Sequence, residues 1–331
     1  MTSPLTSDFI FALTNPGSEK ALKLEVDVEK LDWRSSYQRK GFVTFKRGAA
    51  FTLDDLDAPL ACTRRLCLSL GKARTRDEAA QLVTAQLEHP LVHHARYQLG
   101  KMEALPGDQP ARPKTGQLVG TVVELSPEEF WAGVHRHGHL TSTDPAGDPG
   151  LVMPEEAPSR AWLKMEEAIR FFNLTFKAED KAVELGCAPG GVVMALLKRG
   201  VSVVGVDPAK MSKVLTPFTI TDRWHPPAKQ AWFYHCRKPA ALAGKSDLGQ
   251  DLTWFMSDMN QSPEVVLKEC ARFCRMAPTI RGLLVTLKLT NPEDVTEKST
   301  WLAAVAKMGF KTIRLQQLGA HHRELVLFAK R

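Results

Sequence analysis

The sequence lacks the features of a membrane-spanning or exported protein. None of its apolar runs approaches the ~18 residues that cross a bilayer. Its start, MTSPLTSDFIFAL, has neither the basic region nor the long apolar core of a secretory signal. From these absences we expect a cytoplasmic protein that makes no contact with a membrane.

The sequence also lacks the cysteine patterns of a zinc site or a disulfide framework. Its 6 cysteines include no Cys-x-x-Cys pair, which is the spacing that metal-binding cysteines usually show. We therefore expect reduced thiols and no bound metal.

Charge is distributed unevenly along the chain, whose formal net charge is +7. Residues 1–150 contain 18 Lys and Arg against 19 Asp and Glu, whereas residues 151–331 contain 26 against 18. The second half is therefore the basic one. An excess of this sign suits a polyanionic partner such as RNA.

Histidines are clustered in VHRHGH (134–139). In an extended chain His135, His137 and His139 share one face, which would suit a metal site. No carboxylate or cysteine pattern supports that, so we favour a polar or RNA-facing strand. We expect His93-His94 and His321-His322 to be surface or loop histidines rather than ligands.

The stretch with the strongest pattern is AVELGCAPGGVVMALLKRGVSVVGVD (182–207). A short apolar run ends in a glycine-rich turn, an apolar helical segment follows, and a β-branched run stops at Asp207. This is a βαβ unit of a nucleotide-binding α/β sheet. The glycines let the backbone approach a ligand closely, and Asp207 can accept hydrogen bonds from both hydroxyls of a ribose.

The rest of the chain predicts two domains. Residues 1–145 alternate strand-like and helical segments in the manner of an α+β domain. Residues 146–158 are rich in Pro, Gly and Asp and are typical of a linker. In 159–331, Ser159 is a candidate N-cap for a helix over 161–173. Further strands are expected at 231–235, 252–256 and 282–287, and a hairpin over 311–317 and 324–329.

Four polar residues lie at related positions of this sheet. Asp258 and Lys288 end two strands, Glu324 opens the last one, and Lys164 lies on the helix that leads into the sheet. Ligands of such sheets bind beyond the carboxyl ends of the strands. A lysine there can deprotonate an attacking hydroxyl if its pKa is lowered toward neutrality. We expect the second lysine to lower it, while the carboxylates orient the ammonium groups.

The turn Gly-x-x-Pro-Gly-Gly departs from the dinucleotide fingerprint and resembles motif I of class I methyltransferases. The four polar residues resemble the Lys-Asp-Lys-Glu set of the FtsJ/RrmJ-type ribose 2′-O-methyltransferases. Similarity is specific in APSRAWLKMEEA (157–168), ELGCAPGG (184–191), WFMSDM (254–259), LVTLKL (284–289) and HHRELVLF (321–328). TNPGSEKAL (14–22) resembles the start of family members in which a THUMP-type RNA-binding domain follows.

The resemblance implies a Rossmann-like α/β domain with a seven-stranded, mostly parallel sheet, preceded by a THUMP-like domain. It implies S-adenosylmethionine as cofactor and RNA, most specifically large-subunit ribosomal RNA, as substrate, with a monomer favoured. Lys288 would be the general base, completed by Lys164, Asp258 and Glu324. The cofactor would be bound by Ser159, Gly186, Cys187, Ala188, Pro189, Gly190, Gly191, Asp207 and Asp258.

The chain departs from the family pattern at two places. Val192 stands where an aromatic residue usually follows the glycines, and HCRK (235–238) stands where an acidic residue commonly binds adenine.

The residues bear on four alternatives. A base-modifying methyltransferase would carry Asn/Asp-Pro-Pro-Tyr/Phe where this chain has SDMN (257–260), and a carbon-5 enzyme would need a Pro-Cys pair, which the chain lacks. A non-catalytic RNA-binding or assembly protein on the same fold stays open, as does a methyltransferase that acts on another RNA.

Overall fold

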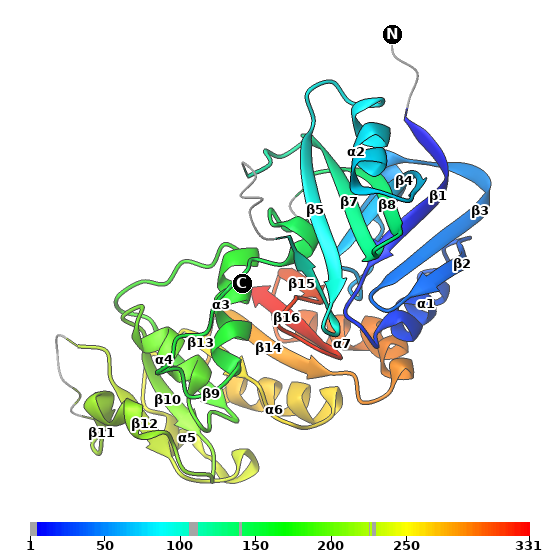
Figure 1. The fold of residues 1–331 in the computed structure, drawn as a ribbon. Coiled ribbons are helices and arrows are strands. Elements are labelled where there is room, and N and C mark those ends of the chain that lie inside the picture. Colours follow the sequence, from blue (N-terminus) through cyan, green and yellow to red (C-terminus); the bar gives the residue numbers. More distant parts are fainter. Residues whose placement is uncertain (1–4, 106–111, 139–140, 225, 227–229) are drawn as a thin grey trace. The chain divides into compact units, whose positions relative to one another are not determined.

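The structure is a computed structural model that describes residues 5–105, 112–138, 141–224, 226 and 230–331. The chain divides into two compact units (Figure 1). Unit 1 comprises Met1–Gly150 and Gln316–Arg323, and unit 2 comprises Leu151–Leu315 and Glu324–Arg331. The segment 146–158, expected to be a linker, spans the division. A short loop near the C-terminus, which we had placed in the second domain, belongs to unit 1.

Unit 1 is built on a sheet of eight strands in the part of the chain that is described. Neighbouring strands are antiparallel except for one parallel pair, β5 and β7. In spatial order the strands are β2 (Arg34–Arg39), β3 (Phe42–Thr52), β1 (Thr6–Leu13), β4 (Arg65–Ala73), β8 (Glu129–Arg136), β7 (Leu118–Ser126), β5 (Leu91–Gln98) and β6 (Lys101–Ala104). The unit also contains α1 (Glu19–Val28), α2 (Arg76–Thr84) and the 3-10 turns η1 (Leu53–Asp57) and η2 (Pro145–Gly147).

Helix α2 packs on one face of this sheet. Its Ala79 and Val83 are fully buried against Val122 and Phe130. The approach is so close that a Cβ atom on Gly120 would lie 2.3 Å from Val83 Cγ1. The α+β character expected of this region follows from such helix-on-sheet packing.

Unit 2 is built on a second sheet, again of eight strands among the described residues. In spatial order they are β11 (Thr219–Ile220), β12 (Phe233–Cys236), β10 (Ser202–Val206), β9 (Lys181–Leu185), β13 (Trp254–Ser257), β14 (Gly282–Lys288), β16 (Glu324–Lys330) and β15 (Thr312–Gln316). The first six run parallel, and β16 is antiparallel to β14. Seven strands were expected; the two-residue β11 adds an eighth, because it pairs with β12 at the edge.

The helices of unit 2 connect these strands (Figure 1). They are α3 (Ala161–Phe171), α4 (Gly191–Leu197), α5 (Lys245–Leu248), α6 (Pro263–Met276) and α7 (Lys298–Lys307), with 3-10 turns η3 (Lys213–Phe218), η4 (Ala240–Leu242) and η5 (Pro292–Glu297). Ser159 is not the N-cap of α3, because the helix begins at Ala161 and Arg160 occupies the cap position.

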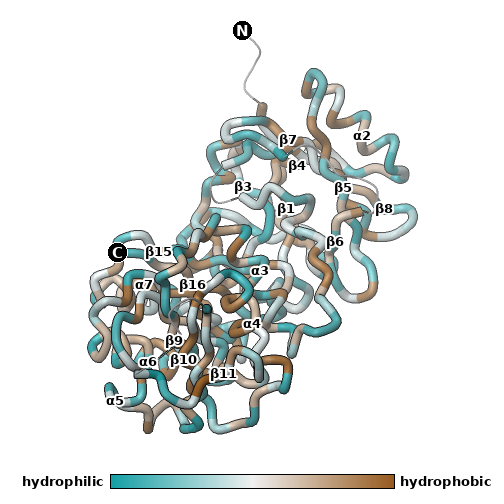
Figure 2. Tube along the Cα trace, turned by 90° about the vertical axis from the view of Figure 1, so that its left-hand side faces the viewer, coloured by the Kyte–Doolittle hydropathy of each residue, from teal (hydrophilic) through white to brown (hydrophobic). Residues whose placement is uncertain are grey.

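The strand order of unit 2 reverses between β9 and β13. From β9 the chain builds β10 and β12 toward one edge, and then returns to build β13 and β14 toward the other. Ligands of open α/β sheets bind at such a reversal, beyond the carboxyl ends of the strands. The strands there are buried on both faces, which explains their continuous apolar sequence. Figure 2 shows hydrophobic colour concentrated on β10 and α4.

In the described ranges, no helix combines the length and the hydropathy needed to cross a bilayer.

Candidate active site

The glycine turn lies at the strand reversal, between β9 and α4. Gly186 and Gly190 have φ angles of +74° and +116°, a conformation that favours glycine over any residue with a side chain. The start of α3 packs against this turn, since a Cβ atom on Gly191 would lie 2.5 Å from Ser159 Oγ and 2.7 Å from Trp162 N. The backbone at the turn is therefore closely packed, and Ser159 lies beside it as expected.

Cys187, in the same turn, points into the protein. Its side chain is 2% exposed, and a Cβ atom on Gly205 of β10 would lie 2.6 Å from its Sγ. Burial raises the pKa of the thiol, and Glu184 and Asp207 add to the effect. Any contact of Cys187 with a ligand would therefore come from its backbone.

Asp207 follows β10 and is fixed by two backbone donors. Its Oδ2 accepts a hydrogen bond from Ala188 N at 3.1 Å, and its Oδ1 accepts one from Ala209 N at 2.8 Å. An ionised carboxylate has about four acceptor positions. Asp207 is therefore held in one orientation and keeps acceptor capacity on both oxygens, as a ribose diol requires.

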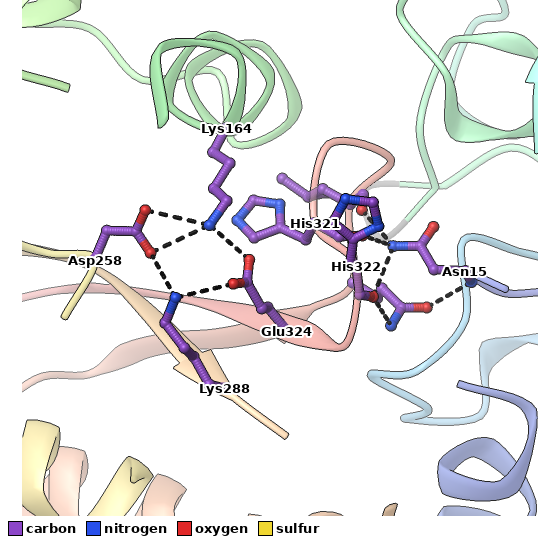
Figure 3. A network of polar contacts seen from close by, with 9 residues as sticks. Asn15, Lys164, Asp258, Lys288, His321, His322 and Glu324 are labelled. Carbon is purple, nitrogen blue, oxygen red and sulfur yellow. Dashed lines mark hydrogen bonds and ion pairs between the residues drawn. The ribbon is translucent and has the colours of Figure 1, made fainter. Parts of the chain in front are cut away.

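Lys164, Asp258, Lys288 and Glu324, which we call the tetrad, converge in unit 2 (Figure 3). Lys164 Nζ lies 3.2 Å from both Asp258 carboxylate oxygens and 2.7 Å from Glu324 Oε2. Lys288 Nζ lies 3.1 Å from Glu324 Oε1 and 3.7 Å from Asp258 Oδ1. Each carboxylate thus lies between the two ammonium groups.

The sheet accounts for this convergence. Lys288 and Glu324 are directly opposite each other in the antiparallel pair β14–β16. Asp258 follows Ser257, the last residue of the neighbouring β13, and Lys164 comes from α3. The four side chains are between 13% and 21% exposed, so a ligand can reach a largely dry cluster.

The electrostatics of Lys288 differ from expectation. Burial lowers the pKa of its ammonium group, but Asp258 and Glu324 together outweigh burial and raise that pKa above 10.5. We had expected repulsion from Lys164 to lower it. That expectation is wrong for this arrangement, because the attraction between Lys288 and the two carboxylates outweighs the repulsion between the two lysines.

Behind the tetrad, Glu184 is a buried carboxyl group on β9. It is 1% exposed, and its Oε2 has no hydrogen-bond partner among the described residues. Burial, with added repulsion from Asp258 and Asp207, raises its pKa well above the usual value. It was outside our predicted site, although it directly precedes Leu185 and the glycine turn.

Asn15 and its neighbours were missed as a polar network, although TNPG (14–17) had been singled out as a resemblance. They hold the loop 316–323 within unit 1. Asn15 Nδ2 donates to Leu318 O at 2.8 Å and to His321 O, and Asn15 N donates to Gln317 Oε1 at 2.8 Å (Figure 3). Gln317 Nε2 donates to Ser18 Oγ at 2.8 Å. The residue after this loop is Glu324 of the tetrad.

The histidine expectations are only partly met, because His321 and His322 lie in the loop 316–323, as expected, and His322 is exposed. His135 and His137 are 2% and 6% exposed, and His93 and His321 are buried too, so none of them lies on a polar surface. His135 Nε2 contacts the buried Arg65 guanidinium, and burial together with Arg65 lowers the pKa of His135. His139 lies outside the described residues. In the described ranges, no group of three His, Cys, Asp or Glu side chains is placed to hold a metal, and the six cysteines form no disulfide with one another.

Residues 157–266 match the family described as FtsJ-like methyltransferase. The match covers 110 of the 331 residues and lies within unit 2, with the glycine turn and Asp258 inside the matched range.

Curated relatives carry the name ribosomal RNA large subunit methyltransferase M. The protein of Histophilus somni strain 2336 is 45% identical over 75 residues, 21% of each chain. That of Actinobacillus pleuropneumoniae serotype 3 is 47% identical over 75 residues, again 21% of each chain. That of Shewanella frigidimarina is 31% identical over 147 residues, 40% of each chain. The chain thus matches between 21% and 40% of the length of these relatives.

Proposed function

We propose that this protein is an S-adenosylmethionine-dependent methyltransferase that modifies a ribose 2′-hydroxyl of RNA, and that the RNA is large-subunit ribosomal RNA. The observation that carries the proposal is the tetrad, with two lysines and two carboxylates in mutual contact where the strands end. The match to the FtsJ-like methyltransferases and the names of the relatives support methyl transfer and the ribosomal substrate.

The residues at the strand reversal fit this cofactor. Gly186 and Gly190 allow the positive φ angles of the turn, and Met259 and Leu215 occupy the space that their Cβ atoms would take. Asp207 keeps acceptor capacity for the ribose hydroxyls. Ser159, the turn 186–191 and Asp258 complete the set that we assign to binding. When bound, S-adenosylmethionine would supply an electrophilic methyl group, and its thioether would be the leaving group.

Lys288 is assigned as the general base that takes the proton of the 2′-hydroxyl. Its raised pKa means that the side chain is protonated at rest and must first release a proton. Burial acts in the direction that favours the neutral form, so covering the tetrad with RNA would strengthen that effect. Lys164 and the two carboxylates orient the amine, because each carboxylate contacts both lysines.

The N-terminal unit is assigned to RNA binding as a THUMP-like domain. The support is the likeness of TNPGSEKAL (14–22) and the α+β architecture of the unit. A cytoplasmic monomer is part of the same proposal.

The test is methyl transfer from labelled S-adenosylmethionine to large-subunit ribosomal RNA that lacks its modifications. Wild type is compared with Lys288→Ala and with the control Lys330→Ala, an exposed lysine of β16. We expect 2′-O-methylation by wild type and by the control. Lys288→Ala should lose it while binding the cofactor normally.

Two results would overturn the proposal. A methyl group mapped to a base would contradict the assigned chemistry. Wild-type turnover by Lys288→Ala would contradict the assigned base. No transfer to any RNA, with cofactor binding intact, would favour the non-catalytic alternative.

A further inference from the structure

The segment 208–250 holds most of the excess positive charge of the protein. It contains 7 Lys and Arg against 2 Asp and Glu, within a chain whose net charge is +7. Its described residues include β11, β12 and α5, on the side of the second sheet away from β14 and β16 (Figure 1). We call six of its residues the basic strip: Lys210, Lys213, Arg223, Trp224, Arg237 and Lys238.

Trp224 and Arg223 form a stacked pair on this surface. Trp224 is 52% exposed, an unusual state for so large an apolar side chain. The Arg223 guanidinium carbon lies 5.0 Å from the centre of the Trp224 ring and 4.8 Å from the centre of the Tyr234 ring. Arg223 is itself fixed, because it donates to Tyr234 Oη at 3.0 Å and to Ser246 O. The indole is therefore supported by a fixed cation while much of its surface faces solvent.

The cations of the strip are mostly uncompensated. Lys210, Lys213 and Arg237 are exposed, and none of them forms an ion pair with a carboxylate of the described residues. Arg237 Nε donates only to the backbone oxygen of Pro208, at 3.2 Å. Lys238 differs, since it pairs with Asp247 at 2.8 Å. Three cations are thus available to an anionic ligand.

The strip lies along the same edge of the sheet as the tetrad. β11, β12, β10, β9, β13 and β14 are parallel, so their carboxyl ends share one edge. Arg223 and Trp224 follow β11, Arg237 follows β12, and Lys210 follows β10. Four strand spacings of about 4.8 Å separate β12 from β14, about 19 Å in all. Several nucleotides of a single strand can bridge that separation.

We propose that the basic strip binds single-stranded RNA that flanks the target nucleotide, with Trp224 stacking on a base and the lysines contacting phosphates. An exposed aromatic ring beside uncompensated cations is the combination by which proteins bind single strands. A base inside a duplex presents no free face to an aromatic ring, so the stacked pair selects an unpaired base. The inference rests on the proposed function, because it takes RNA to be the substrate of unit 2.

The test measures binding of a short fluorescein-labelled single-stranded RNA of mixed sequence, by fluorescence anisotropy with the full-length protein. Trp224→Ala should weaken binding about 5- to 100-fold, the range for loss of one base–aromatic stack. Trp224→Phe should restore most of the affinity. The matched control is Leu242→Ala, at another exposed apolar residue of the same segment outside the strip, which should bind as wild type does.

A second measurement counts the phosphate contacts. The dependence of log affinity on log salt concentration should flatten by ~1.4 in Lys210→Ala/Lys213→Ala, because each phosphate contact on a single strand contributes about 0.7. Cofactor affinity, measured by calorimetry, should be unchanged in all these variants.

The outcomes separate this surface from the proposed activity. Wild-type RNA affinity in Trp224→Ala would contradict the proposal that the basic strip binds single-stranded RNA. Tighter binding to the same RNA in a duplex would contradict it as well. Loss of cofactor affinity in Trp224→Ala would also contradict the proposal, because it would show that the strip belongs to the cofactor site. Trp224-dependent binding without methyl transfer by wild type would support the surface and overturn only the proposed function.

Discussion

Two polar networks of this protein differ in charge and burial. The anchor network of unit 1 (Thr14, Asn15, Ser18, Gln316 and Gln317 with the carbonyls that they bind) consists of neutral groups, although the Arg64 guanidinium donates to Asn15 Oδ1 at 3.4 Å. Thr14, Asn15 and Gln317 are at most 3% exposed. The tetrad of unit 2 consists of four ionisable side chains that are 13% to 21% exposed. Neutral groups in a dry environment satisfy one another and hold one arrangement.

The tetrad differs from the anchor network because its charges are not needed to stabilise the fold. Two ion pairs in a partly exposed cluster contribute little net stability, since desolvation opposes their attraction. The same charges respond strongly to a ligand that covers them. Substitutions in the anchor network should therefore lower the stability of the protein, whereas substitutions in the tetrad should lower its activity.

The sharpest test of that contrast is Lys288→Arg. Arginine keeps the positive charge between Asp258 and Glu324, so the free energy of unfolding should change little. It cannot act as a base, because its guanidinium does not lose a proton in proteins. We expect methyl transfer to fall about 10²- to 10⁴-fold, measured under single-turnover conditions. A near-normal rate in this variant would show that a positive charge at position 288 is sufficient for methyl transfer and that no base is needed there.

Asn15→Ala should have the opposite signature. It leaves the carbonyl oxygens of Leu318 and His321 without their buried donor, which costs about 3 kcal/mol in total. Urea unfolding should report that loss, and amide hydrogen exchange in the loop 316–323 should accelerate. Gln250→Ala, a change at an exposed amide, is the control. Unchanged exchange in the loop would contradict the role of the anchor network.

The pH dependence of transfer should follow Lys288. Because Asp258 and Glu324 raise the pKa of its ammonium group above 10.5, the neutral fraction is small at pH 7 and grows about tenfold with each pH unit. The single-turnover rate should therefore rise about 100-fold between pH 6.5 and pH 8.5. A rate that stays flat across this range would indicate that proton removal does not limit transfer, or that Lys288 is not the base.

How much the sequence could predict depends on the range of the interaction concerned. The glycine turn, Asp207, Asp258 and Lys288 were predictable because each lies at the carboxyl end of a parallel strand, and the topology then brings these ends together. Glu324 opens β16 opposite Lys288, and Lys164 comes from α3. The link between Asn15 and Gln317 was not predictable, since it joins uncharged residues 302 positions apart with no local pattern. The alternation of His135 and His137 correctly put them on one face, but could not tell that this face is buried.

The pKa of Lys288 was missed for a related reason. Its direction depends on whether two carboxylates within 3.7 Å outweigh burial and the second lysine. Sequence supplies the charges but not the distances that decide between them.

Asp207 combines features of both networks. Backbone donors fix it as firmly as a structural residue, while its remaining acceptor positions are available to a ligand. Asp207→Asn would present an amide NH₂ to either Ala188 N or Ala209 N, two donors facing each other, and would lose one of the two fixing bonds. We expect cofactor affinity to fall about tenfold, the effect of one charge-assisted hydrogen bond. Calorimetry measures that loss, whereas transfer at saturating cofactor should stay within about twofold of wild type, since the tetrad is untouched. Equal loss in both measurements would place Asp207 with the tetrad rather than with the binding residues.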